Sequence, residues 1–142
     1  MTVAAILATR SGEIITGTPD MSVREAVSLL AQRKIGAVPV MERERVAGVM
    51  SERDVIYCLA RDGAAILDWP VSKIMTSPAI TVEPGTTALS ALSLMTSRRI
   101  RHLPVVEGKK LVGIVSIGDL VKYRLDKIEQ EAAQMLSYIQ SA

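Results

Sequence analysis

Apolar side chains recur at helical spacing in two stretches of the chain. One stretch follows Ser22 and the other follows Thr87, and both residue types favour the position before a helix because their hydroxyls accept a bond from a free backbone amide. The apolar positions are Val23, Ala26, Val27 and Leu30 in the first stretch, and Ala88, Ala91, Leu92 and Met95 in the second. Because steps of three and four residues place side chains on one helical face, we predict an amphipathic helix in each stretch.

Each predicted helix is followed by two short runs rich in Val, Ile, Leu and Met. The runs cover residues 37–41 and 46–50 in the first half of the chain, and 102–106 and 111–115 in the second half. Ser51 and Ser116 then open a further helix, and a short strand before each first helix completes the unit. Strands that are apolar on both faces need helices to cover their sheet, so we predict an α/β fold.

The two halves of the chain are copies of one unit. Sliding the sequence along itself by 65 residues, which places Pro19 on Pro84, aligns the copies without a gap from Thr16 to Ala60. Before Thr16, residues 6–8 resemble residues 74–76 once a three-residue insertion is placed at Arg10 to Gly12. We therefore expect a first repeat at 1–62, a linker at 63–72, a second repeat at 73–123 and a C-terminal helix at 124–142.

The C-terminal segment carries a stripe of apolar residues at alternating steps of three and four. The stripe consists of Leu125, Ile128, Ala132, Met135 and Ile139. This is the a/d pattern of a helix that pairs with another helix, so we expect a homodimer in which this helix is a contact. About three heptads is near the lower limit for a coiled coil, and a helix folded back onto its own domain remains the alternative.

Composition and charge exclude several classes of function. The net charge is +2 and the pI is about 8.8, which is too mild a basic balance to indicate nucleic-acid binding. A small arginine cluster at 98–101 is the one feature that suggests nucleic acid, and we do not expect such binding. The apolar runs are too short for a membrane span and the first residues do not resemble a secretory signal, so we expect no membrane contact and a cytoplasmic protein. Cys58 is the only cysteine and is expected to be a small core residue.

The residues also give no indication of an enzyme. His102 is the only histidine and has no nucleophile in a recognisable triad motif, the chain has no Walker glycine loop, and no His, Cys or carboxylate spacing suggests a metal. We therefore expect no catalytic site, no metal site and no catalytic cofactor.

Ser51 with Asp54, and Ser116 with Asp119, form the same Ser-x-x-Asp pattern. A serine-capped helix end has free backbone amides and a partial positive charge, which suit a phosphate. An aspartate one turn into the helix is a pure acceptor, which suits the two vicinal hydroxyls of a ribose. The same pattern also fits a capping box, which needs no ligand, and from the residues alone both interpretations stay open.

With this pattern, each copy resembles a CBS motif. The motif is an apolar-Pro-Val strand, here at Pro39-Val40 and Pro104-Val105, followed by Gly-apolar-apolar-Ser-x-x-Asp, here at 48–54 and 113–119. The resemblance covers nearly the whole chain except the last helix, and the chain is similar to small stand-alone bacterial proteins with a CBS pair. It implies two sheets packed face to face in pseudo-twofold symmetry. It also implies two clefts that commonly hold adenosine ligands such as AMP, ADP, ATP, NAD or S-adenosylmethionine.

The resemblance also implies which residues line the clefts. The pair before each apolar-Pro-Val strand faces a cleft, which assigns phosphate or adenine contacts to Arg101 and His102, while Arg98 and Arg99 are expected on the helix surface. The adenine is expected between Ile15 and Ile35 in one cleft and between Ile80 and Ile100 in the other. The remaining expected ligand-binding residues are Ser51, Ser116, Asp54 and Asp119, Thr76 for its hydroxyl, Gly36 and Ala37 for close approach of a base, and Arg53 for charge.

The function expected from these features is that of a regulatory module. An adenine nucleotide binds between the repeats and biases their packing, and the dimer or an effector protein responds to the change. We expect the cleft of Asp119 to bind more tightly, on the premise that Arg101 and His102 stand beside Asp119. The alternative is a scaffold with vestigial clefts that serves dimerisation or holds an effector protein.

Overall fold

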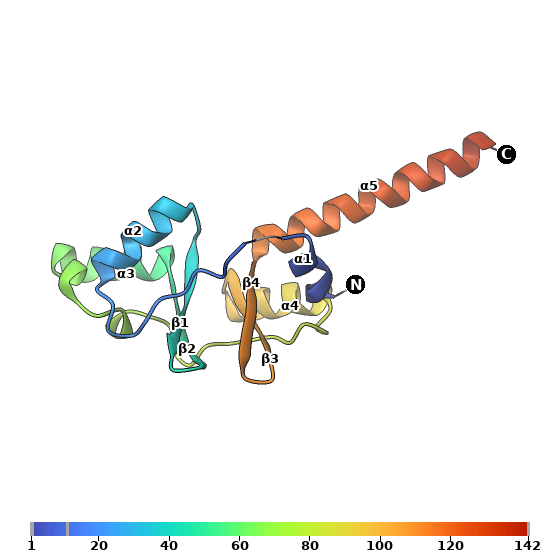
Figure 1. Ribbon diagram of the computed structural model, residues 1–142. Helices are drawn as coiled ribbons and strands as arrows, with labels where there is room; N and C mark the ends of the chain where they lie inside the picture. The colour runs from blue at the N-terminus through green and yellow to red at the C-terminus, as the bar shows by residue number, and fades with distance from the viewer. Residues whose placement is uncertain (1, 11, 142) are drawn as a thin grey trace.

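The computed structural model describes residues 2–10 and 12–141, and this part of the chain has the predicted α/β architecture (Figure 1). The first repeat contains α2 (Val23–Arg33), β1 (Ala37–Glu42), β2 (Arg45–Ser51) and α3 (Glu52–Asp62). The second repeat contains α4 (Ala88–Arg98), β3 (His102–Glu107), β4 (Lys110–Ser116) and α5 (Ile117–Ser141). A short helix α1 (Val3–Ala8) precedes them, and two 3-10 helices, η1 (Gly63–Asp68) and η2 (Val71–Lys73), occupy the predicted linker and its end.

The four strands form two antiparallel hairpins with the same register. Ala37 pairs with Ser51 in the first hairpin as His102 pairs with Ser116 in the second, and both hairpins have an irregularity at the equivalent position. The short strand predicted before each first helix is only a single parallel bridge in each repeat, between Gly17 and Val40 and between Val82 and Val105. The two hairpins stand beside each other at the centre of the molecule, with β2 in contact with β4 and the helices outside (Figure 1).

The first helix of each repeat begins and ends in the same way. The hydroxyl of Ser22 accepts a hydrogen bond from the Glu25 amide, and the hydroxyl of Thr87 accepts one from the Ser90 amide. Both helices end at a residue in the left-handed conformation, Lys34 or Arg99, each with a φ of 54°. These ends set the direction in which the chain enters β1 and β3.

Each repeat has its own hydrophobic core, and each core is completed by a segment that precedes the other repeat. Val3 and Ile6 of α1 are buried in the second core, while Val71 and Ile74 are buried in the first. The backbone amide of Val3 also donates to the carbonyl of Thr86. The repeat boundaries at residues 62 and 73 therefore divide the sequence but not the cores. The segment before the first repeat packs in the second core, and the segment before the second repeat packs in the first core.

The exchanged segments contact equivalent glycines of the two repeats. A β-carbon at Gly48 would lie 2.9 Å from the sulfur of Met75, and one at Gly113 would lie 2.7 Å from a methyl carbon of Leu7. Leu7 thus takes the place of Met75 in space. This arrangement agrees with the similarity of residues 6–8 to residues 74–76 in the sequence.

The C-terminal helix expected at 124–142 continues directly from the second helix of the second repeat, so that α5 is one helix of 25 residues. Its only glycine, Gly118, lies in the first turn and the helix contains no proline, so nothing ends it near residue 123. The helix extends far from the body of the molecule (Figure 1), and all its described residues from Ile128 onward are exposed.

Cys58 is buried in the first core, as predicted for a small core residue. Among residues 2–10 and 12–141, no helix is long and apolar enough to cross a membrane. The same described residues contain no cluster of three His, Cys, Asp or Glu side chains with the arrangement of a metal site.

Candidate functional site

The carboxylate of Asp54 lies at the start of α3 and is held in place by its own helix end. One oxygen, Oδ2, accepts a hydrogen bond from the Ser51 amide at 2.8 Å, and the Asp54 amide donates to the Ser51 hydroxyl at 3.3 Å. The other oxygen, Oδ1, accepts a hydrogen bond from the Thr76 hydroxyl at 3.0 Å. The capping box is therefore present, and it fixes the orientation of a carboxylate whose second oxygen faces a side chain from the start of the second repeat.

Asp54 lies in a cleft between the two repeats, which we call the Asp54 cleft. Its volume is about 410 Å³. The first repeat supplies the end of β2 and the first turns of α3, while the second repeat supplies the segments 76–80 and 99–102. The lining residues are Val49, Ser51, Arg53, Asp54, Tyr57, Thr76, Ala79, Ile80, Arg99, Ile100, Arg101 and His102.

Basic side chains are concentrated in the Asp54 cleft. Arg53, Arg99 and Arg101 all line it. The Arg53 guanidinium donates to the carbonyl of Arg99 at 3.3 Å and to the hydroxyl of Tyr57 at 3.1 Å, so it bridges the two repeats. Three arginines and one partly exposed carboxylate line this cleft, so its lining residues carry an excess of positive charge, which favours an anionic ligand.

Two expectations about these arginines were wrong. Arg101 lines the cleft of Asp54 and not that of Asp119, because the loop before β3 faces across the pseudo-twofold axis toward the first repeat. Arg99 was expected on the helix surface, but it is the left-handed residue at the end of α4 and lines the same cleft. The premise that Arg101 stands beside Asp119 therefore does not hold.

His102 occupies the space between the two clefts and lines both of them. Burial lowers the pKa of its imidazole below the ordinary value of 6.5, while the carboxylates of Glu52 and Asp119 act in the opposite direction and Arg101 lowers it further. The imidazole packs against Gly36, where a β-carbon would lie 3.1 Å from its Nε2 atom. Gly36 was expected to allow the close approach of a ligand base, but in the structure the group closest to it is His102.

Asp119 lies in the equivalent cleft on the other side, the Asp119 cleft, with a volume of about 510 Å³. Its lining residues include Ile15, Ile35, Gly36, Ala37, His102, Ser116 and Asp119, together with Leu7, Arg10, Glu13 and Lys34. The Ser116 amide donates to Asp119 Oδ2 at 2.7 Å and the Asp119 amide donates to the Ser116 hydroxyl at 3.1 Å. The second Ser-x-x-Asp pattern therefore caps its helix as the first does.

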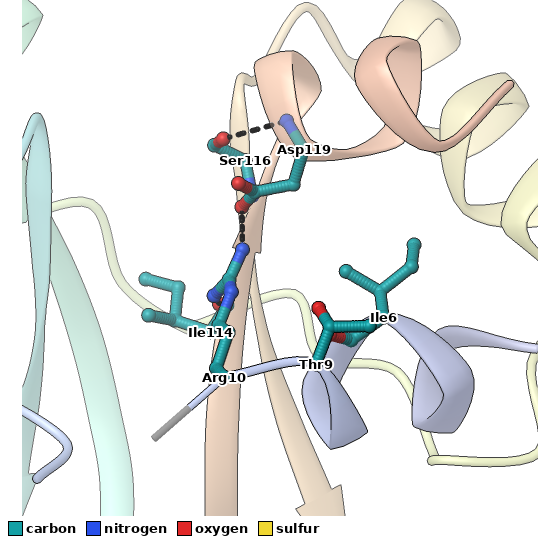
Figure 2. Close-up of polar contacts among 6 residues, drawn as sticks. All are labelled: Ile6, Thr9, Arg10, Ile114, Ser116 and Asp119. Atoms are coloured by element: carbon teal, nitrogen blue, oxygen red, sulfur yellow. Dashed lines mark hydrogen bonds and ion pairs between the residues drawn. The ribbon is translucent and has the colours of Figure 1, made fainter. Parts of the chain in front are cut away.

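The two clefts differ in what contacts the aspartate. Asp119 forms an ion pair with Arg10, whose guanidinium also donates to the carbonyl of Ile114 at 2.6 Å (Figure 2). Partial burial acts to raise the pKa of Asp119, but the hydrogen bonds from Ser116 and the guanidinium of Arg10 outweigh it and lower that pKa below its ordinary value of 3.8. Asp54 has a neutral hydroxyl, that of Thr76, as its corresponding partner.

The structure thus brings the expected site residues together in two groups. Ser51, Arg53, Asp54, Thr76, Ile80, Ile100 and Arg101 line the Asp54 cleft, and Ile15, Ile35, Gly36, Ala37, Ser116 and Asp119 line the Asp119 cleft, with His102 common to both. Arg10 and Tyr57 were not among the expected site residues. The sequence did mark Arg10 as unusual, because it lies in the three-residue insertion that distinguishes the first repeat from the second.

Comparison with known proteins agrees with the tandem repeat. The family model described as CBS domain matches residues 3–61 and again residues 71–126. The chain belongs to the CBS domain family. These two matches reproduce the tandem arrangement seen in the fold, so this protein is a CBS-domain pair.

Solved structures and curated relatives of this CBS pair are similar over most of its length. A CBS-domain protein from Agrobacterium tumefaciens is 39% identical with a TM-score of 0.82, covering 87% of this chain and 92% of the other. The CBS pair of protein MJ0100, solved in complex with 5'-methylthioadenosine and S-adenosyl-L-methionine, is 25% identical with a TM-score of 0.79, covering 89% and 98%. The mitochondrial protein CBSX3 from Arabidopsis thaliana is 38% identical over 128 residues, which are 87% of this chain and 62% of that protein.

Proposed function

We propose that this CBS pair is a regulatory module that binds a phosphorylated adenosine ligand in the Asp54 cleft. The observation that carries the proposal is the presence of a fixed carboxylate, two isoleucines and three arginines in one cleft between the repeats. The complex of MJ0100 with two adenosine compounds supports the choice of ligand class. The proposed role is regulatory rather than catalytic, and we expect the protein to act in the cytoplasm, where adenine nucleotides are available to it.

Each part of an adenosine phosphate has a counterpart in the cleft. Asp54 accepts hydrogen bonds from the ribose hydroxyls, with Thr76 released from Oδ1 or shared with the ligand. Ile80 and Ile100 provide the apolar contacts for the adenine ring. The phosphate is bound by the arginines, whose planar guanidinium groups match phosphate oxygens. Binding then couples the repeats, because the lining residues come from both.

This assignment favours the Asp54 cleft over the Asp119 cleft, contrary to the expectation from the sequence. The Asp119 cleft has Arg10 and Lys34 as its basic residues, but Arg10 is paired with Asp119 and Glu13 adds a negative charge. Arg53, Arg99 and Arg101 lie in the other cleft. We infer that a phosphate-bearing ligand binds first beside Asp54.

Calorimetric titration with AMP tests the assignment. Asp54→Asn keeps the size of the side chain and removes its charge, and loss of hydrogen bonds to a charged group costs about 1.5–3 kcal/mol, which is roughly a ten- to hundredfold loss of affinity. Asp119→Asn, the matched control in the other cleft, is expected to leave the tighter site unchanged. Equal effects of the two variants would contradict the choice of cleft.

A thermal-shift screen separates this function from the scaffold alternative. A ligand present at about a hundred times its dissociation constant stabilises the folded state by about 2.7 kcal/mol, which raises the melting temperature measurably. AMP, ADP, ATP, NAD and S-adenosylmethionine are the compounds to compare. If none of them raises the melting temperature, the clefts are vestigial and the function is that of a dimerisation or effector-binding scaffold.

We further propose that the protein is a homodimer in which two α5 helices pair through the apolar stripe. Leu125, Met135 and Ile139 are 54%, 67% and 64% exposed in the single chain, although such residues are normally buried. With the stripe at a and d positions, Arg124 falls at g and Glu129 at the following e position. In a parallel pair these two positions meet across the helices, and their opposite charges make a second copy of this helix a suitable partner.

Sedimentation of the full chain and of a chain ending at Tyr123 tests the dimer. The shortened chain is expected to be monomeric, because it lacks every stripe residue. A full-length Leu125→Glu, Ile139→Glu variant is the second test, since it keeps the helix and removes only part of its apolar surface. A dimer that survives both changes would mean that the contact lies in the repeats themselves.

A further inference from the structure

In the Asp119 cleft, the side chain of Arg10 contacts two residues whose equivalents in the Asp54 cleft are contacted by the backbone and hydroxyl of Thr76. In the Asp54 cleft, the Thr76 backbone pairs with that of Val49 and the Thr76 hydroxyl donates to Asp54. The equivalents of Val49 and Asp54 are Ile114 and Asp119 by the 65-residue offset. The guanidinium of Arg10 contacts both of these equivalents.

The position of Arg10 is fixed by the helix that precedes it. Its backbone amide donates to the carbonyl of Leu7 at 3.1 Å, and the Thr9 hydroxyl donates to the carbonyl of Ile6 at 2.7 Å, so the end of α1 is well defined. Because Val3 and Ile6 of α1 are buried in the second core, the end of this helix cannot move far without disturbing that core. From this anchored backbone the side chain of Arg10 runs beside β4 to the start of α5 (Figure 2).

The contact between Arg10 and Asp119 is specific but reversible. The side chains are 38% and 33% exposed, so water screens the ion pair and its strength is modest. A ribose that binds through both carboxylate oxygens of Asp119 needs Oδ2, which is the oxygen that Arg10 contacts. Rotation of this partly exposed side chain removes Arg10 from Asp119 and also breaks its hydrogen bond to the carbonyl of Ile114.

We propose that Arg10 is an internal occupant of the Asp119 cleft that competes with the ribose of an adenosine ligand for Asp119. The chain therefore binds one adenosine where two Ser-x-x-Asp clefts are present, and its second cleft accepts a ligand only when Arg10 turns away. This inference rests on the proposed function, since it takes the aspartates to be ribose acceptors. It adds a residue that determines how many ligands are bound.

The test is a titration of the full chain with adenosine, which is neutral, so that no phosphate contact of Arg10 affects the result. The wild type is expected to bind one equivalent, and Arg10→Met, which keeps the stem and removes the charge, is expected to bind two. Arg61→Met is the matched control, because Arg61 pairs with Asp62 on α3 outside both clefts, and it should retain one equivalent. Two equivalents in the wild type, or one in Arg10→Met, would overturn the proposal.

A second set of variants separates this proposal from the proposed function. Asp54→Asn should weaken adenosine binding in the wild-type background by a factor of about ten or more, whereas Asp54→Asn with Arg10→Met should recover one site at Asp119. Absence of binding of both adenosine and AMP in every variant, Arg10→Met included, would overturn the proposed function itself.

A carboxyl NMR titration reports on Arg10 independently of any ligand. Because the Arg10 guanidinium contributes to the lowered pKa of Asp119, that pKa should rise in Arg10→Met and stay the same in Arg61→Met. An unchanged Asp119 pKa in Arg10→Met would show that Arg10 does not occupy the cleft in solution, which overturns the proposal.

Discussion

Gly36 and His102 are in contact where the two repeats meet, and the contact leaves little room for a side chain at position 36. A β-carbon there would lie 3.1 Å from Nε2 and 3.2 Å from Cε1 of the imidazole. Because His102 lines both clefts, this single contact connects the packing of the repeats with the shape of both candidate sites.

The first prediction concerns Gly36→Ala. The added methyl forces His102 to shift, and overpacking of this kind costs about 1–3 kcal/mol of unfolding free energy, measured by urea denaturation. Gly85→Ala is the control, since no atom lies within 4 Å of its β-carbon position, and it should be neutral or slightly stabilising. The combination with His102→Ala should recover part of the loss. Equal stability of the two single alanine variants would show that the Gly36 contact is not tight.

The second prediction compares the equivalent glycines of the two repeats. A β-carbon at Gly48 would lie 2.7 Å from the backbone carbonyl oxygen of Thr76, which cannot rotate away, whereas at Gly113 the first contact is a methyl of Leu7. We therefore expect Gly48→Ala to cost about 3 kcal/mol and Gly113→Ala about 1 kcal/mol, because Leu7 can adjust its rotamer. Thermal or urea unfolding of the two variants checks the order, and a larger loss for Gly113→Ala would contradict it.

The third prediction is a pH dependence of stability that originates in His102. Its pKa is lowered in the folded protein, so the unfolded state binds the proton more readily and the unfolding free energy decreases as the pH falls below about 6.5. Well above that pH the imidazole is neutral in both states and contributes no slope. Urea denaturation of wild type and His102→Gln between about pH 7.5 and about pH 5, which spans the ordinary pKa, should show a steeper decrease for the wild type. Parallel curves would exclude His102 as the cause.

The fourth prediction concerns recognition of phosphate. Arg101→Ala should weaken AMP binding about ten- to hundredfold and leave adenosine binding nearly unchanged, since only AMP has the charged group that the guanidinium binds. Arg98→Ala is the matched control, because Arg98 is exposed on α4 and does not line the cleft. Comparison of the two ligands by calorimetry checks this. A similar loss for adenosine would mean that Arg101 shapes the cleft rather than binding the phosphate.

The elements of the fold could be predicted because their signals are local. Apolar runs between turn residues located the strands to within one residue at each end, and Ser22 and Thr87 marked the starts of two helices. The assignment of Ile15 with Ile35 and of Ile80 with Ile100 to separate clefts agrees with the structure as well. These assignments followed from spacing along one repeat or from the resemblance to the family.

The errors arose where the answer depends on contacts between the repeats. Arg101 lines the Asp54 cleft because its loop points across the pseudo-twofold axis toward the first repeat. The spacing of residues along the sequence does not predict the direction of that loop. Gly36 lines the Asp119 cleft as expected, but nothing in the sequence places His102 against it. Arg10 was overlooked as a site residue for the same reason, since its partner, Asp119, lies far along the chain in the other repeat.

The exchange of first segments between the two cores also has a consequence for how the protein forms during synthesis. Helix α1 is made before both repeats, yet the surface that buries Val3 and Ile6 is made of residues from the second half of the chain. The first core is likewise incomplete until η2 and Ile74 have been made. The first core can therefore be complete once the chain has been made as far as Met75, whereas the second core requires that α1 be retained until β4 has been made, which closes a loop that spans the whole first repeat.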